Sequence, residues 1–230
     1  MGRLISGVNG QIQGKVGNLI GSSRNGIAYV KGPYKNRTKK VSEKELLNRK
    51  KFAMAQKWLK PLVEFVRIGF RGYSQRSQGF VAAKSWLLHN SFTGTGENLQ
   101  IDPALVKLSS GDLPNPKDMA VELMETGNLK FTWNPASDES NAKDQIMMVA
   151  YNVDSAHVLS MTTGQFRSNG SDILKVQKMD NKSFHIYAAF NAADRSRQSD
   201  SIYLGEWKFP PSDSSSIPSG DSSPGLPSPL

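Results

Sequence analysis

The sequence predicts an α+β protein, in which a glycine-rich β-hairpin and helical module at the N-terminus precedes an antiparallel β-sandwich at the C-terminus. Three observations lead to this class. Eight glycines occur in the first 32 residues, apolar residues then recur at helical spacing to about residue 90, and beyond residue 97 the period shortens to two. A chain of 230 residues can hold two modest domains. We therefore expect domains at residues 1–96 and 97–209.

The first expected element is a small β-meander over residues 11–31. Asn25-Gly26 is a strong hairpin signal, because both residues tolerate the positive φ that a tight turn requires. The other glycines allow sharp bends or close backbone packing within a small sheet. Pro33 ends the meander, and a basic connector follows it.

Helical spacing begins after Ser42, because Ser42-Glu43-Lys44-Glu45 has the form of a capping box. Pro61 interrupts the pattern, so two abutting helices are expected over residues 43–60 and 61–69. A third helix is expected near residues 76–90. The apolar face of the first two helices is predicted to consist of Leu47, Phe52, Met54, Trp58, Leu59, Leu62, Phe65 and Val66.

Short strands and turns dominate the rest of the chain. Two strands are expected around Asp102-Pro103, at Leu99–Ile101 and Leu105–Leu108. Seven more follow, a number typical of a β-sandwich: Met119–Met124, Asn128–Trp133, Gln145–Tyr151, His157–Met161, Ile173–Gln177, Phe184–Asn191 and Ser201–Phe209. Residues 210–230 contain six prolines and eight serines, so they are predicted to be a disordered tail.

The charge is distributed unevenly along the chain, whose net charge is +9. Residues 1–96 carry 18 basic and 3 acidic side chains, whereas residues 97–230 carry 11 basic and 17 acidic ones. Such an asymmetry indicates either a domain that meets a polyanion or two surfaces with different partners. The alternative is attraction between the two halves, within one molecule or between copies that self-associate.

The candidate binding residues are cations of the connector and the first helices, with tyrosines between them. Phosphates bind such arrays mainly through counterion release, and tyrosines can stack on exposed bases. The predicted nucleic-acid or polyanion-binding residues are Lys31, Tyr34, Lys35, Arg37, Lys39, Lys40, Arg49, Lys50, Lys57, Lys60 and Arg67. An acidic protein surface is a second partner class, and a solvated basic face that only keeps the protein soluble is the third interpretation.

The sequence gives little evidence that the protein is an enzyme. There is no cysteine, and the three histidines are far apart, so neither a thiol nucleophile nor a local metal pair can be recognised. Gly10-x-x-x-Gly14-Lys15 is one residue too short for a phosphate-binding loop, and Val16 stands where Ser or Thr would bind magnesium. We therefore expect a non-enzymatic protein with no catalytic residue, cofactor, metal or small-molecule substrate.

The N-terminus lacks the apolar run of a signal peptide, and no stretch approaches the roughly 18 apolar residues that cross a membrane. The expected location is therefore cytoplasmic or virion-associated, without a membrane partner.

Several motifs resemble known families. Residues 7–23, the Gly-Ile-x-Tyr-Val arm at 26–30 and Glu-Lys-x-Leu-x-x-Arg-x-Lys-Phe at 43–52 are similar to an uncharacterised Bacteroidota family, catalogued as a domain of unknown function. Small phage and prophage proteins share the hairpin, connector and helix more loosely. Phe131-Thr132-Trp133 and Ala188–Asn191 resemble fibronectin type III and immunoglobulin-like sandwiches, although no tyrosine-corner residue is evident.

Together these features predict a structural or binding protein, of phage or mobile-element origin, whose basic N-terminal module docks on nucleic acid or on an acidic assembly partner. The alternative is a surface or secreted adhesion module that binds glycan or protein through the loops of the sandwich. The missing signal sequence counts against this alternative.

Overall fold

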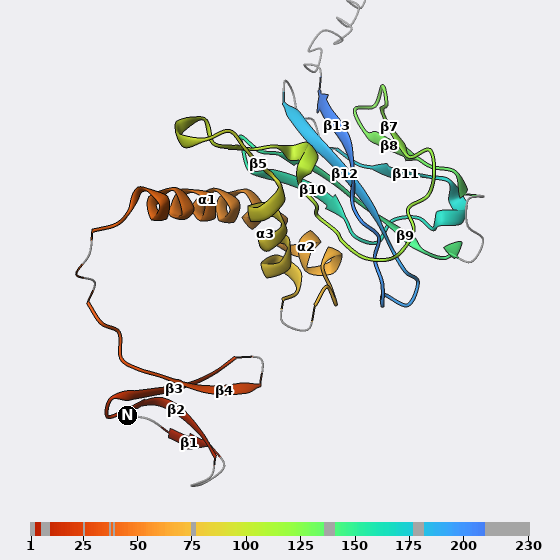
Figure 1. Ribbon diagram of the computed structural model, residues 1–230. Helices are drawn as coiled ribbons and strands as arrows, with labels where there is room; N and C mark the ends of the chain where they lie inside the picture. Colours follow the sequence, from red (N-terminus) through yellow and green to blue (C-terminus); the bar gives the residue numbers. More distant parts are fainter. Residues whose placement is uncertain are drawn as a thin grey trace, which may run out of the picture.

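The computed structural model describes residues 3–5, 10–24, 26–36, 38, 40–74, 77–135, 141–176 and 182–209. Over this part of the chain the fold is mixed α+β, with helices and four antiparallel sheets, as the sequence predicts in outline (Figure 1). The expected tail at residues 210–230 lies outside the described residues. No helix in the described ranges is long and apolar enough to cross a membrane.

The N-terminal sheet is a four-stranded meander in the order β1-β2-β3-β4, and it confirms the predicted meander. Its strands are β1 (Arg3–Ile5), β2 (Gln11–Val16), β3 (Leu19–Arg24) and β4 (Ile27–Lys31). In Figure 1 this sheet stands apart from the rest of the molecule, to which the connector joins it. None of the residues of β2–β4 that the structure describes belongs to either hydrophobic core cluster.

Two glycines explain how this sheet bends. Gly14 has a φ of 98°, which a side chain rarely adopts, in the middle of β2. The N-terminal half of β2 pairs with β1 and its C-terminal half pairs with β3. Ile12 then crosses over Gly21, where an added Cβ would collide with the Ile12 carbonyl. These glycines therefore allow close backbone packing, as the sequence suggests.

The helical segment begins at the predicted capping box. The Ser42 Oγ accepts a hydrogen bond from the Glu45 backbone N–H at 3.3 Å. Helix α1 (Glu43–Leu59) passes into a single 3-10 turn, η1 (Lys60–Leu62), and then into α2 (Val63–Gly69). Pro61 therefore tightens one turn of a continuous helical segment rather than separating two helices. The third helix, α3 (Gly79–Asn90), is shorter than expected at its N-terminal end.

One residue of the predicted apolar face is exposed, and Leu47 and Met54 are half-buried. Phe52 is 50% exposed, whereas Trp58 and Leu59 nearer the C-terminal end of α1 are buried. The Lys84 ammonium lies 4.1 Å from the centre of the Phe52 ring, and it donates a hydrogen bond to Gln56 Oε1 at 3.0 Å. A cation from α3 therefore covers part of this ring.

A short hairpin follows α3, built from β5 (Phe92–Thr93), η2 (Gly96–Asn98) and β6 (Gln100–Ile101). The strand expected at Leu105–Leu108 is wrong. The Asp102 side chain accepts from the Ala104 N–H at 2.9 Å and starts the 3-10 turn η3 (Pro103–Leu105). This cap and Pro103 favour a turn where three apolar residues in a stretch of four suggested a strand.

The seven later strands are all present and form two sheets. The four-stranded sheet has the order β10-β9-β12-β13 and the three-stranded sheet the order β11-β8-β7. A 3-10 turn, η6 (Arg167–Asn169), precedes β11. The strands are β7 (Ala120–Leu123), β8 (Leu129–Thr132), β9 (Gln145–Asn152), β10 (His157–Met161), β11 (Ser171–Leu174), β12 (Ser183–Asn191) and β13 (Ile202–Lys208).

The four-stranded sheet is covered on both faces, and β9 shows this most clearly. Its residues Met147, Val149 and Tyr151 pack with the buried side chains of α1, α2 and α3. The alternate residues Ile146 and Met148 pack with the buried side chains of the three-stranded sheet. The helices and the four-stranded sheet, called the central sheet below, therefore share a hydrophobic core. The domain boundary expected at residue 96 stays a prediction.

Candidate polyanion-binding surface

The register of the N-terminal sheet places its cations on one face. Residues directly opposite each other on antiparallel strands share a face, and successive residues alternate between faces. Lys15 lies opposite Ile20, and Ile20 lies opposite Lys31, so both lysines share a face. By the same alternation we define the basic face as Lys15, Ile20, Ser22, Arg24, Ile27, Tyr29 and Lys31.

The opposite face of β2–β4 carries no charged side chain. Val16 lies opposite Leu19, and Gly21 lies opposite Val30. We define this neutral face as Gly14, Val16, Leu19, Gly21, Ser23, Ala28 and Val30. All three cations of β2–β4 therefore lie on the face that also carries Tyr29.

The cations of the basic face are available for an external anion. Lys15 and Arg24 are exposed, and Lys31 is half-buried. The ion pairs within the described ranges involve other cations, so no described carboxylate neutralises this face. The Lys31 Nζ donates to the Tyr34 hydroxyl at 3.2 Å, and this hydrogen bond raises the pKa of Lys31 above its ordinary value. Lys31 therefore stays charged.

The connector continues the basic surface beyond β4. Tyr34 is 87% exposed, and Lys35 and Lys40 are exposed as well. Arg37 and Lys39, which were also predicted to bind the anion, lie outside the described residues.

The five predicted cations of the helices do not behave alike. Arg49 forms an ion pair with Glu45 at 2.7 Å, and the Lys50 Nζ donates to the Gly96 carbonyl at 3.3 Å. Lys57, Lys60 and Arg67 are exposed, with no carboxylate partner among the described residues.

The geometry of α1 spreads these cations over its surface. Arg49 and Lys60 are eleven residues apart, about three helical turns, so they share a face. Lys50 and Lys57 lie roughly a quarter turn away from them. Figure 1 shows the sheet apart from these helices, so the structure does not bring the two predicted sets of cations onto one surface.

Sequence reasoning missed two of the three cations of the basic face, Lys15 and Arg24. The signal was available, because both stand at alternate positions of predicted strands on either side of a hairpin. Taking every second residue back from Lys31, through the turn at Gly26, would have placed both cations on the face that carries Tyr29.

Lys57 also lines a cavity of about 570 Å³ between α1, the β9–β10 turn and β12. Trp58 and Tyr151 are buried beside it, and their rings meet edge to face at 5.0 Å. His185 stands in the wall, with its Nδ1 3.0 Å from the Tyr203 hydroxyl, and burial lowers the pKa of His185. The described ranges hold no group of three His, Asp or Glu side chains that could bind a metal ion.

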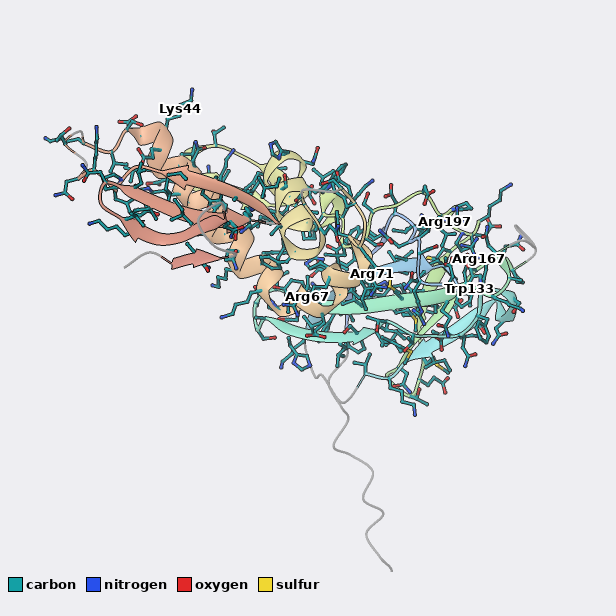
Figure 2. The ribbon with its side chains drawn as sticks, turned by 90° about the horizontal axis from the view of Figure 1, so that it is seen from below. Lys44, Arg67, Arg71, Trp133, Arg167 and Arg197 are labelled. Carbon is teal, nitrogen blue, oxygen red and sulfur yellow. The ribbon has the colours of Figure 1, made fainter. Side chains whose placement is uncertain are left out.

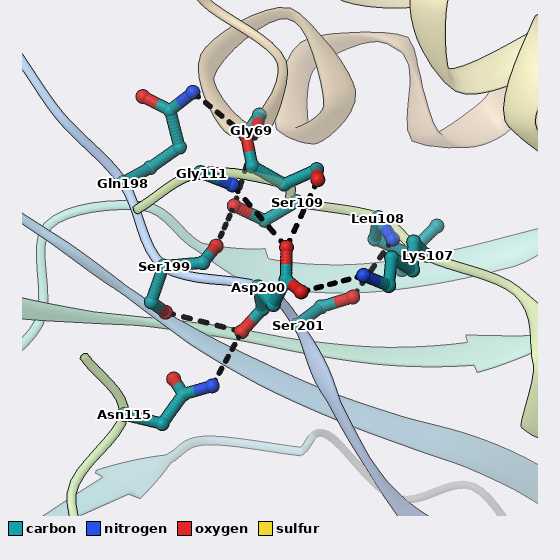
Figure 3. Close-up of polar contacts among 11 residues, drawn as sticks. Gly69, Lys107, Leu108, Ser109, Gly111, Asn115, Gln198, Ser199, Asp200 and Ser201 are labelled. Carbon is teal, nitrogen blue, oxygen red and sulfur yellow. Dashed lines mark hydrogen bonds and ion pairs between the residues drawn. The ribbon is translucent and has the colours of Figure 1, made fainter. Parts of the chain in front are cut away.

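A second polar cluster surrounds Asp200 between the helices and the central sheet (Figure 3). The Asp200 carboxylate accepts from Lys107 Nζ at 2.5 Å and from Ser110 Oγ at 2.9 Å. The Ser109 hydroxyl donates to the carbonyl of Ser199 at 2.6 Å, and its oxygen also lies 3.1 Å from the Gly69 carbonyl. These contacts join the end of α2 to the segment before β13, so this cluster is a structural joint.

Residues 11–205 match one protein family, DUF6266, which is described as a family of unknown function. No curated protein and no solved structure matches the chain. The match confirms the predicted relation to a family of unknown function. The Bacteroidota origin, the fibronectin type III likeness and the phage link stay predictions.

Proposed function

The chain belongs to DUF6266, a family of unknown function, and from its own residues we propose that residues 1–42 bind a polyanion and that this polyanion is a nucleic acid. The observation that carries the proposal is the register of β2–β4, which gathers Lys15, Arg24 and Lys31 on one face. Tyr29 lies on the same face, and the connector cations follow directly.

The distribution of charge supports the assignment of binding to residues 1–42. Dividing the chain at residue 42 separates the basic segment more sharply than dividing it at residue 96. Residues 1–42 hold eight lysines and arginines and no aspartate or glutamate. Residues 43–230 hold the other 21 cations and all 20 carboxylates. Almost the whole net charge therefore belongs to the sheet and the connector. Phosphates that neutralise such a segment release condensed counterions, which drives association at low salt.

The test is an anisotropy titration of a labelled DNA oligonucleotide of about 15 nucleotides, a length near the upper end of known site sizes. The triple variant Lys15→Gln/Arg24→Gln/Lys31→Gln should bind at least tenfold more weakly at about 50 mM salt. Its log–log salt slope should fall by about two, because each phosphate contact on a single strand contributes roughly 0.7.

The matched control is Lys117→Gln/Lys143→Gln/Lys175→Gln, which removes the same charge from exposed positions of residues 43–209. It should bind like the wild-type protein. Equal losses in the two triple variants would show that total charge, rather than this face, attracts DNA. Undetectable binding at micromolar protein would end the proposal and favour an acidic protein as the partner.

We also propose that the two large sheets form a β-sandwich with helices on its outer face. Buried side chains of β7, β8 and β11 pack with those of β9 and β12 in one cluster, which supports this arrangement. In this proposal the sandwich is a non-enzymatic body that displays a binding surface. Capsid, tail or recombination genes beside the coding gene would support a phage or mobile-element origin, and secretion or polysaccharide genes would favour adhesion.

A further inference from the structure

We infer that the nucleic acid is single-stranded and that its unpaired bases stack on Tyr29 and Tyr34. This inference rests on the proposed function of residues 1–42 and adds the strand state of the partner. A stacking site needs aromatic rings with an uncovered face, cations beside them for the phosphates, and a spacing that a stretch of bases can span. The described residues meet each requirement.

Tyr29 presents its ring on the basic face of the sheet. It is 42% exposed, although it lies in the interior of β4. The residue opposite is Ser22, whose small side chain does not cover an aromatic ring. None of the aromatic contacts between described residues involves Tyr29. Its ring is therefore open to a planar partner from outside.

Tyr34 is more exposed than any other large apolar or aromatic side chain in the described ranges. The Lys31 Nζ lies 5.1 Å from the centre of its ring and donates to its hydroxyl. This contact holds a cation at the hydroxyl end of the ring. Because the side chain is 87% exposed, the ring remains available to a base, and Lys31 stands where it can also meet a phosphate.

The spacing of the two tyrosines suits a run of stacked bases. They are five positions apart in the chain, a span of at most about 18 Å. Stacked bases rise by about 3.4 Å each, so the two rings can lie at most about five bases apart. Lys15 and Arg24 lie on the same sheet face to receive the phosphates. A double helix keeps its base faces inside the stack, so it can use the cations but not the rings.

The experiment compares three polyanions: a labelled oligothymidine of about 15 nucleotides, a hairpin duplex of equal phosphate number, and heparin. The wild-type protein should prefer the single strand. The variants Tyr29→Leu and Tyr34→Leu should each weaken binding of the single strand about tenfold. Affinity for the duplex and for heparin should stay within about twofold, because the cations remain.

Tyr29→Phe and Tyr34→Phe are the matched controls, since they keep a stacking ring and should bind the single strand like the wild type. Tyr34 lies outside any strand, so Tyr34→Leu decides the question even where Tyr29→Leu disturbs the sheet. Equal affinity for single strand and duplex, with no loss in Tyr34→Leu, would overturn the inference and leave the proposed function standing. Absence of binding to all three polyanions would overturn both.

Discussion

Arg167 is the largest side chain that is completely buried in the described part of the protein. Its Nη2 donates to the Pro114 carbonyl at 2.6 Å and lies 3.6 Å from Asp144 Oδ2. Its backbone carbonyl accepts from the Trp133 indole N–H at 2.7 Å. Figure 2 shows Arg167 and Trp133 together, at the opposite end of the molecule from Lys44. This guanidinium ties the loop before β11 to the core of the two large sheets.

Removing the carboxylate beside this guanidinium should be costly. Asp144→Ala removes a buried carboxylate 3.6 Å from a fully buried guanidinium, so we expect a loss of about 3–5 kcal/mol in unfolding free energy. The exposed pair of Arg197 and Asp112, 3.7 Å apart, provides the control. Asp112→Ala should cost less than about 1 kcal/mol. Urea denaturation of both variants measures the difference, and similar losses would contradict a special role for Arg167.

At the scale of elements, the joint around Asp200 fixes how α2 meets the central sheet. The Ser110 N–H donates to the Gly69 carbonyl at 2.8 Å, and a Cβ on Gly69 would collide with the Leu108 carbonyl. Helix α2 therefore ends in direct backbone contact with residues 108–110. The Asp200 carboxylate accepts hydrogen bonds from Ser110 and from the neighbouring Gly111.

The ionisation of Asp200 should make this joint sensitive to acid. Burial alone would raise the pKa of Asp200, but hydrogen bonds from Lys107 and Ser110 lower it below its ordinary value of 3.8. A group whose pKa is lower in the folded state stabilises the fold above its unfolded pKa, and this contribution is lost as the pH falls through the folded pKa. Asp200→Asn should therefore be less stable than the wild type at neutral pH, with a gap that narrows below about pH 4.

Urea unfolding of both proteins at about pH 7 and pH 3 measures this gap, with Glu64→Gln on the exposed side of α2 as the control. The control should follow the wild type at both values. If the difference in unfolding free energy between the two proteins were the same at both pH values, the shape of Asp200 rather than its charge would stabilise these contacts.

The elements could be predicted from the sequence wherever a local signal was strong. The capping box placed the start of α1, and short apolar or alternating stretches between turn signals placed all seven strands of the two large sheets. The expected strand at Leu105–Leu108 was wrong, because three apolar residues in a stretch of four do not distinguish a strand from an irregular buried segment. Hydrogen bonds of Leu108 and Ser109 to Ser201 and Ser199 hold that segment, and such partners lie about 90 residues away.

At the scale of the whole molecule, one signal of the packing was present in the sequence. Residues 146–151 are apolar at every position, which is typical of a strand buried on both faces. A sandwich with one solvated face on each sheet would alternate instead. The partner that covers the second face could not be inferred, because a helical period reveals an apolar face without identifying what packs on it. The candidate site could be predicted only in part. The connector cations stand close together in the sequence, whereas placing Lys15 and Arg24 on one face requires the register of the strands.

The shared core leads to the last prediction, which concerns the units of folding. Residues 97–209 alone would expose the face of the central sheet that carries Met147, Val149 and Tyr151, which is buried by the helices in the full chain. We expect this fragment to aggregate or to lack a cooperative transition, because a large apolar patch loses its cover. Residues 43–209 keep both covers of the sheet, so this fragment should melt cooperatively within about 3 °C of the full chain. Circular dichroism melts of the two fragments test this directly. A cooperative, β-type transition for residues 97–209 would instead support the division at residue 96, with helices that add to an already stable sandwich.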